Sequence, residues 1–259
     1  MQRRIPKLCG ASMRFVLVAL VASVGACATE PELLPASGHR SAMGRSSLAV
    51  ERRSGVTVTA DGSVWDSSPQ TLETELTPLW VTLRNDTGRS LRVQYDEFTL
   101  RGASGAIYIA LAPYVLRASR SRRVFEVQDG GDFEKFHVAA YLAPFYPWLP
   151  VWNGPLAYGP SVSSVGARAG LPTDSMLQRA LPEGVLENGG SVSGFLYFKK
   201  VDVRESRATF EAGLQEPTPA WQPTRQVAAI DIPFLRVDRR PPNESPYTAP
   251  PRAPDWMDN

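Results

Sequence analysis

Residues 79–95 read LWVTLRNDTGRSLRVQY, the clearest strand pattern in the chain. Apolar residues alternate with other side chains over 79–84, and the same two-residue period returns over 91–95. Side chains of a strand point alternately to the two faces of a sheet, so this period indicates two strands with one buried face each. The polar run between them contains Asn, Asp and Gly, which favour tight turns. The stretch therefore predicts a β-hairpin with its tip at residues 85–88.

Shorter strand patterns lie on both sides of this stretch. Two β-rich runs flank Asp61-Gly62, a dipeptide that favours a hairpin turn. After Asp96-Glu97 the apolar positions shift to Phe98 and Leu100, which indicates a bulge or a bend. Seven or eight strands are expected in all, with no long helical period between them. We therefore predict a mainly β fold, an antiparallel immunoglobulin-like β-sandwich. The remaining strand-like runs are 106–111, 189–201, 208–214 and 226–237.

The composition divides the chain into four parts. Residues 1–26 form a leader, 27–55 a flexible stalk, 56–238 the β-sandwich domain and 239–259 a proline-rich disordered tail. A long insertion at 112–188 interrupts the strand pattern and is expected to be mostly irregular. It contains the run PTDSMLQRAL, which predicts one short helix, because Thr173 or Asp174 can cap the first turn and Pro182 ends it.

The leader has the pattern of an export signal. The uncharged run from Phe15 to Ala26 has twelve residues, whereas a helix needs about twenty to cross a bilayer. Four basic residues and no acidic residue precede it, and small residues lie at its end. Basic, apolar and small segments in that order are typical of a secretory signal peptide. The basic residues are Arg3, Arg4, Lys7 and Arg14.

The end of the leader, Val24-Gly25-Ala26-Cys27, resembles the lipobox of bacterial lipoproteins. The resemblance covers only the first tenth of the chain. It implies cleavage in front of Cys27 and a diacylglyceryl group on the Cys27 thiol, and two acyl chains suffice for stable anchoring. It also implies a place in the cell envelope, at the outer membrane, because Ala28 stands where an aspartate favours inner-membrane retention. Ordinary secretion after cleavage near Cys27 is the alternative.

Removal of the leader changes the charge of the chain. The whole sequence has 28 Lys plus Arg and 26 Asp plus Glu, and the leader carries four of the bases and none of the acids. The remainder has 24 bases against 26 acids, a net charge of −2, which gives no argument for nucleic acid as a partner. Cys9 leaves with the leader and Cys27 is expected to carry lipid, so we expect no disulfide.

Motifs for catalysis or metal binding are scarce. Asp86-Thr87-Gly88 matches the triplet of aspartic proteases, but its polar neighbours favour a turn. The two histidines, His39 and His137, have no second histidine or carboxylate at ligand spacing, so we expect no metal and no cofactor. We therefore predict a protein that is not an enzyme. The alternative is an envelope hydrolase with a site in the 112–188 insertion, built from residues such as Asp174, Glu183 and His137.

Two stretches of the insertion are candidate contact surfaces. Residues 141–158, YLAPFYPWLPVWNGPLAY, contain six aromatic residues and four prolines and no charge. The prolines exclude a membrane-spanning helix, which leaves a packed loop or a contact surface for proteins or lipid headgroups. Upstream, the run RASRSRR predicts a solvated loop or contacts to the phosphates of a membrane. The residues of the candidate surface are Tyr146, Trp148, Trp152, Arg120, Arg122 and Arg123.

The sequence therefore predicts a lipid-anchored envelope protein that acts as a binding or structural module. Its expected partners are the membrane, through the lipid at Cys27, and an envelope protein.

Overall fold

The computed structural model describes residues 30–36, 47–66, 72–114, 132–154, 156, 171–219 and 221–239. No helix in these ranges is long and apolar enough to cross a membrane. The leader 1–26, Cys27, the three arginines at 120, 122 and 123 and the tail from residue 240 lie outside the described residues. The strands are β1 (Glu30–Pro35), β2 (Leu48–Arg53), β3 (Val56–Asp61), β4 (Leu76–Asn85), β5 (Leu91–Val93), β6 (Phe98–Gly102), β7 (Ile107–Leu111), β8 (Phe133–Ala139), β9 (Val151–Trp152), β10 (Gly184–Lys199), β11 (Arg207–Gln215) and β12 (Gln226–Arg239). The helices are α1 (Leu72–Glu75), η1 (Tyr95–Glu97), η2 (Ala140–Leu142) and α3 (Asp174–Arg179).

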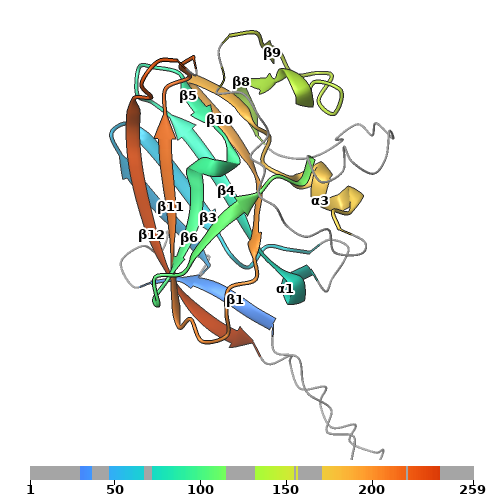
Figure 1. The fold of residues 1–259 in the computed structure, drawn as a ribbon, viewed down its shortest axis with the longest axis vertical. Helices are drawn as coiled ribbons and strands as arrows, with labels where there is room; N and C mark the ends of the chain where they lie inside the picture. The colour runs from blue at the N-terminus through green and yellow to red at the C-terminus, as the bar shows by residue number, and fades with distance from the viewer. Residues whose placement is uncertain are drawn as a thin grey trace, which may run out of the picture.

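The strands form one continuous sheet in the order β1-β12-β11-β6-β7-β10-β4-β3-β2, with β5 and β8 also paired to β10. Every pair of described strands is antiparallel except β8 with β9, so the predicted mainly antiparallel β fold is confirmed. The sheet curls back on itself, as Figure 1 shows, and β2 and β3 pack against β12. Leu33 of β1 also forms a bridge with Gly62, just after β3.

The curled sheet encloses an apolar core. Phe210 of β11 is fully buried in it, with ring centroids of Phe98 and Phe198 at 6.1 and 6.4 Å. β10 is buried on both faces, because Phe198 faces this core whereas Phe195 and Tyr197 lie on the opposite side. This opposite side is called the outer face of β10 below. Trp65 and Trp80 pack against Phe195 there, at centroid distances of 5.1 and 4.9 Å.

The hairpin predicted at residues 79–95 is wrong. β4 and β5 follow one another along the same side of β10, where Asn85 lies opposite Gly190 and Leu91 opposite Leu186. Residues 86–90 form a loop between these two segments, so the polar run joins strands in line instead of reversing the chain. The alternation correctly located the strands, but a two-residue period does not say which strand is the partner.

The first hairpin turn also differs from the prediction. β2 and β3 are joined at Ser54 and Gly55, which have φ of 52° and 81°, a conformation typical of tight hairpin turns. Asp61 instead ends β3, and its carboxylate accepts bonds from the amide and hydroxyl of Ser63, each at 3.0 Å.

The stalk predicted at 27–55 contains two strands of the sheet, so that prediction is wrong for 30–35 and 48–53. β1 pairs along its whole length with β12, from Glu30 opposite Arg239 to Pro35 opposite Phe234. The partner lies about two hundred residues away in the sequence, and a local pattern gives no sign of it. The described domain therefore begins at Glu30, not at residue 56.

The described part of the insertion 112–188 is more ordered than predicted. It contributes β8, β9 and the beginning of β10, and it contains α3, so the predicted helix is confirmed. Thr173 is the N-cap, and its hydroxyl oxygen accepts a bond from the Met176 amide at 3.3 Å. Residues 176–181, from α3 to the approach to β10, cover the outer face of β10, where Ala180 forms a parallel bridge with Phe195. The insertion thus completes the fold.

Candidate functional site

Four buried tyrosines hold residues 176–181 against the outer face of β10, and none of their side chains is more than 3% exposed. This tyrosine cluster draws on η1, the residue after Pro113, the loop after η2, and β10 itself. The hydroxyls of Tyr114 and Tyr146 bond to each other. Three of them donate to backbone carbonyls: Tyr197 to Met176 at 3.0 Å, Tyr114 to Leu177 at 2.7 Å and Tyr95 to Leu181 at 2.5 Å. The single hydroxyl proton of Tyr146 has two acceptors, the Tyr114 oxygen and the Ala180 carbonyl at 3.3 Å.

These bonds supply donors to backbone carbonyls at and after the end of α3. The last carbonyls of a helix have no donor within the helix, and a buried carbonyl without a partner is costly. α3 ends at Arg179, and its C-cap Ala180 is already extended. Burial raises the pKa of each of the four tyrosine hydroxyls, so they remain protonated donors.

The backbone of β10 approaches the same segment closely. The Leu181 amide donates to the Phe195 carbonyl at 2.9 Å. A Cβ atom at Gly194 would lie 2.5 Å from the Leu181 Cα, so only glycine fits at this position. The tyrosine cluster and Gly194 together fix the height of residues 176–181 above the sheet.

Two buried carboxyl groups lie beside the cluster. Glu183 is 2% exposed, and its Oε1 accepts a bond from the Tyr95 amide at 2.9 Å. Among the described residues, its Oε2 has no hydrogen-bond partner. Burial raises the pKa of Glu183 from 4.5 to about 8, against the opposing effect of the Tyr95 amide. Glu183 is therefore mostly protonated at neutral pH.

The second carboxyl, Glu97, accepts a hydrogen bond from the buried guanidinium of Arg92. Its Oε1 lies 2.9 Å from Arg92 Nε, and Arg92 Nη2 donates to Gln215 at 2.8 Å. Burial also raises the pKa of Glu97 to about 8, although the Arg92 guanidinium opposes this effect. The pair links η1 and β5 to β11, beneath the end of the sheet that carries β8 and β9.

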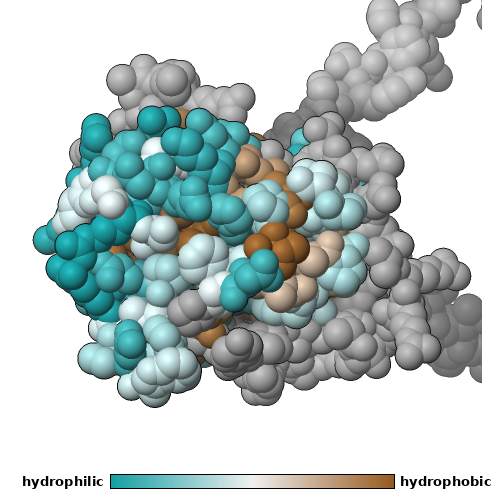
Figure 2. Space-filling model, turned by 90° about the horizontal axis from the view of Figure 1, so that it is seen from above, coloured by the Kyte–Doolittle hydropathy of each residue, from teal (hydrophilic) through white to brown (hydrophobic). Residues whose placement is uncertain are grey.

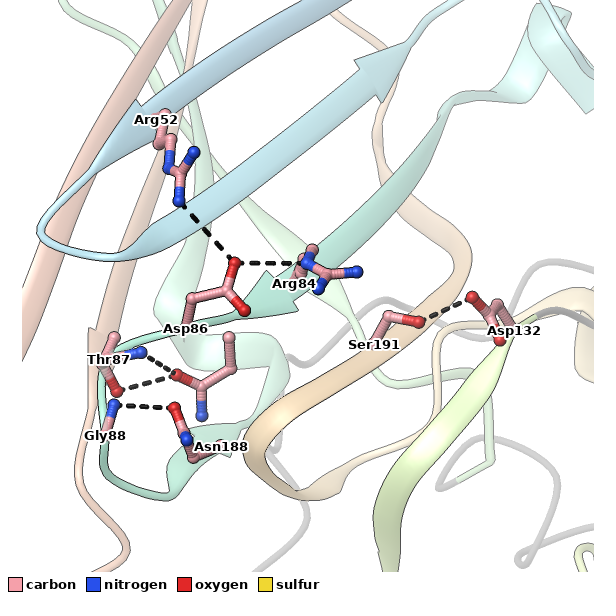
Figure 3. A network of polar contacts seen from close by, with 9 residues as sticks. Arg52, Arg84, Asp86, Thr87, Gly88, Asp132, Asn188 and Ser191 are labelled. Atoms are coloured by element: carbon pink, nitrogen blue, oxygen red, sulfur yellow. Dashed lines mark hydrogen bonds and ion pairs between the residues drawn. The ribbon is translucent and has the colours of Figure 1, made fainter.

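The Asp-Thr-Gly triplet is part of a structural loop (Figure 3). The Asp86 carboxylate lies 3.1 Å from Arg84 Nε and 3.8 Å from Arg52 Nη2. Thr87 donates from its amide and its hydroxyl to Asn85 Oδ1, at 3.1 and 2.7 Å. A carboxylate held by two arginines differs from one that shares a proton with a second carboxyl. The triplet lies in the loop between β4 and β5, not at the tip of a hairpin. Two further bonds of this network join Gly88 N to Asn188 Oδ1 at 2.7 Å and Ser191 Oγ to Asp132 Oδ2 at 2.6 Å.

An aromatic surface lies at the end of the molecule that carries β8 and β9, formed by Tyr141, Trp148 and Trp152. Tyr141 is 43% and Trp148 48% exposed, whereas Trp152 is half-buried with its ring 6.0 Å from that of His137. Figure 2 looks down on this end, with strongly hydrophilic residues on the left and a few hydrophobic residues among pale ones towards the middle. Tyr146, predicted as part of this surface, is fully buried beneath Trp148, so that prediction is wrong.

The residues named for a hydrolase lie in separate surroundings. His137 Nδ1 is 3.4 Å from Glu187 Oε1 on the neighbouring strand. Glu183 is sealed from solvent beside Tyr95, and Asp174 is exposed in the first turn of α3. Within the ranges that the structure describes, no group of three or more His, Cys, Asp or Glu side chains could hold a metal ion.

Sequence reasoning missed the tyrosine cluster, because its members come from four separate segments of the chain. A usable signal was present at Glu183, a single charged residue between the apolar runs ALP and GVL. An isolated acid in such a run indicates a buried and bonded carboxyl.

Comparisons of the chain with protein-family models, with curated proteins and with solved structures found no match.

The tyrosine cluster predicts the effect of Tyr95→Phe. This change removes the hydroxyl donor of the buried Leu181 carbonyl while keeping the ring, and we expect a loss of about 1–3 kcal/mol in the free energy of unfolding. Urea denaturation followed by circular dichroism measures this loss. Tyr141→Phe, at an exposed position, is the control and should change the value by less than about 0.5 kcal/mol. Equal effects of the two variants would contradict the role given to the cluster.

The raised pKa of Glu183 predicts how stability changes with pH. A carboxyl whose pKa is higher in the folded than in the unfolded state stabilises the fold at low pH, and this contribution is lost as pH rises through the folded value of about 8. Glu183→Gln keeps an oxygen for the Tyr95 amide and cannot ionise. Its melting temperature should therefore fall less than that of the wild type between about pH 5 and pH 9. Glu134→Gln, at an exposed position, should keep the wild-type pH dependence.

Proposed function

We propose that the protein is a lipid-anchored protein of the bacterial cell envelope, in which the β domain acts as a binding or structural module without a catalytic step. The observation that carries this proposal is the tetrapeptide Val24–Cys27, which follows a basic and apolar leader too short to cross a bilayer. The residue after Cys27 is Ala28, which favours the outer membrane.

The start of the domain supports a close attachment to the membrane. β1 begins at Glu30, three residues after Cys27. An extended chain covers about 3.3–3.6 Å per residue, so the lipidated cysteine would lie at most about 11 Å from the first paired residue of the sheet. The lipid would then hold the domain directly at the bilayer surface, because no stalk separates the two.

The aromatic surface is the part of the module that we propose for binding. It lies at the end of the long axis opposite to β1 in Figure 1, so Trp148 would face away from the anchoring membrane. The 16 residues of β10 run between the two ends, a length of at most about 50 Å. Half-exposed aromatic rings suit a protein interface that is apolar in its centre and wet at its rim. Its proposed partner is another envelope protein.

We also propose an immunoglobulin-like β-sandwich as the finer fold class. The antiparallel pairing and the packing of β2 and β3 over β12 support it. The extra pairing of β5 and β8 with β10 would be an elaboration of that plan, built around the insertion.

The anchor is tested by Cys27→Ser. We expect the variant to lose the diacylglyceryl group and to leave the membrane fraction, because no thiol remains for lipid attachment. Cell fractionation and intact-protein mass spectrometry measure both effects, and Cys9→Ser is the control, since Cys9 lies in the leader. A bare Cys27 thiol in the purified wild-type protein would refute the anchor.

The binding role is tested by crosslinking in intact cells. We expect Trp148→Ala to lose the crosslinks of the wild-type protein, because it removes the most exposed ring of the aromatic surface. Trp221→Ala removes an even more exposed ring, at 83%, from the loop between β11 and β12 and should leave the crosslinks unchanged. If Trp148→Ala keeps the same partners at the same yield, the aromatic surface does not bind them.

A further inference from the structure

We infer that one end of the domain, formed by residues 102–107 and 202–207, rests on the phospholipid headgroups of the membrane that holds the anchor. These two stretches are called the loop pair below. The inference rests on the proposed lipid at Cys27 and deepens it, because it assigns the surface of the domain that the lipid brings to the bilayer.

The loop pair lies beside the first strand of the domain. The Arg236 amide donates to the Ser206 carbonyl at 3.0 Å, and Arg236 Nη1 donates to the Val203 carbonyl at 2.5 Å. Arg236 is opposite Leu33, three residues from the start of β1 at Glu30. Three residues of a strand span about 10 Å. Glu30 is in turn at most about 11 Å of extended chain from Cys27, so the lipid and the loop pair belong to the same end of the molecule.

The two stretches are fastened to each other. Glu205, 4% exposed, accepts bonds from the Ser104 amide at 3.0 Å and from the Ser104 hydroxyl. The Ala103 amide donates to the Arg207 carbonyl at 3.2 Å. The hydroxyl bond of Ser104 lowers the pKa of Glu205, which keeps the carboxylate charged and able to accept these bonds. The loop pair therefore presents one fixed surface.

The chemistry of this surface fits a headgroup layer. Val203 is 69% and Ile107 54% exposed, although valine and isoleucine are among the residues most often buried. Arg204 and Arg207 are exposed beside them, whereas the Asp202 carboxylate accepts a bond from the Arg204 amide at 2.9 Å. Apolar tips can enter the boundary between headgroups and acyl chains, and guanidinium groups bind phosphates.

The loop at the far end of β11 and β12 has a different composition. Trp221 and the residues after it up to Gln226 are exposed and contain one charged residue, Arg225. This loop follows β11 and precedes β12, so it lies at the far end of those strands from the loop pair. Labels at Val203 and at Trp221 would therefore report on the two ends of the same strands.

The test uses the native lipidated protein with one introduced cysteine. Cys9 leaves with the leader and lipid blocks the Cys27 thiol, so an introduced thiol is the only one available for labelling. Val203→Cys and Trp221→Cys are each labelled with a nitrobenzoxadiazole fluorophore and reconstituted into vesicles of phosphatidylethanolamine and phosphatidylglycerol that contain doxyl-labelled lipid. We expect quenching at position 203 to exceed that at position 221 severalfold. Ile107→Cys serves as a second probe of the loop pair and should be quenched like position 203.

The outcomes separate this inference from the proposed function. If mass spectrometry shows the diacylglyceryl group on Cys27 and all three labels are quenched equally weakly, the orientation is refuted and the anchor stands. If Cys27 carries no lipid and the protein does not bind the vesicles, the anchor is refuted, and the orientation falls with it. Far-UV circular dichroism of each labelled variant, matched to the wild type, ensures that the quenching reports on the folded domain.

Discussion

Hydrogen bonds from the tyrosine cluster to backbone carbonyls are the constraint on which the candidate site depends. They supply donors to carbonyls between the end of α3 and the start of β10, and they keep residues 176–181 on the outer face of β10. The aromatic surface is built on this support, because Trp148 packs on Tyr146, whose hydroxyl bonds to Tyr114 and Ala180. Buried networks of this kind make a site rigid when every member is bonded. The exposed rings at this end therefore lie on a fixed base.

The same support explains why β10 can be buried on both sides. A strand at the edge of a core would show polar residues at every second position, but the run SVSGFLYF is apolar on both faces after its serines. Ser191 and Ser193 both bond to Asp132, the residue before β8. The Ser191 hydroxyl donates to the Asp132 carboxylate, and the Ser193 hydroxyl oxygen accepts from the Asp132 amide. Further along β10, Phe195 and Tyr197 pack against each other on the outer face, and Phe195 also packs against Trp65. Residues 176–181 of the insertion thus cover the outer face of β10.

Much of the fold was predictable from the sequence, but its connections were not. Alternation correctly located the strands at Leu79–Leu83, Phe98–Leu100 and Ile230–Phe234, and capping signals located α3, because both depend on nearest neighbours. The hairpin at residues 79–95 and the stalk failed because pairing partners are chosen by tertiary packing. The sequence left open whether the aromatic run packs or forms a contact surface, and the structure leaves Trp148 half exposed. The burial of Tyr146 and the raised pKa of Glu183 were not, because both arise from segments that meet only in the folded chain.

The pairing of β1 with β12 has a consequence for how the domain is made. Synthesis produces β1 about 190 residues before β12, so β1 must wait for that whole stretch before it finds its neighbour. Contacts of such long sequence separation slow folding and leave an unpaired strand edge open in the meantime. A chain that stops before residue 226 would leave β1 without its partner. Sealing of the domain therefore depends on the arrival of β12, the last strand of the described sheet.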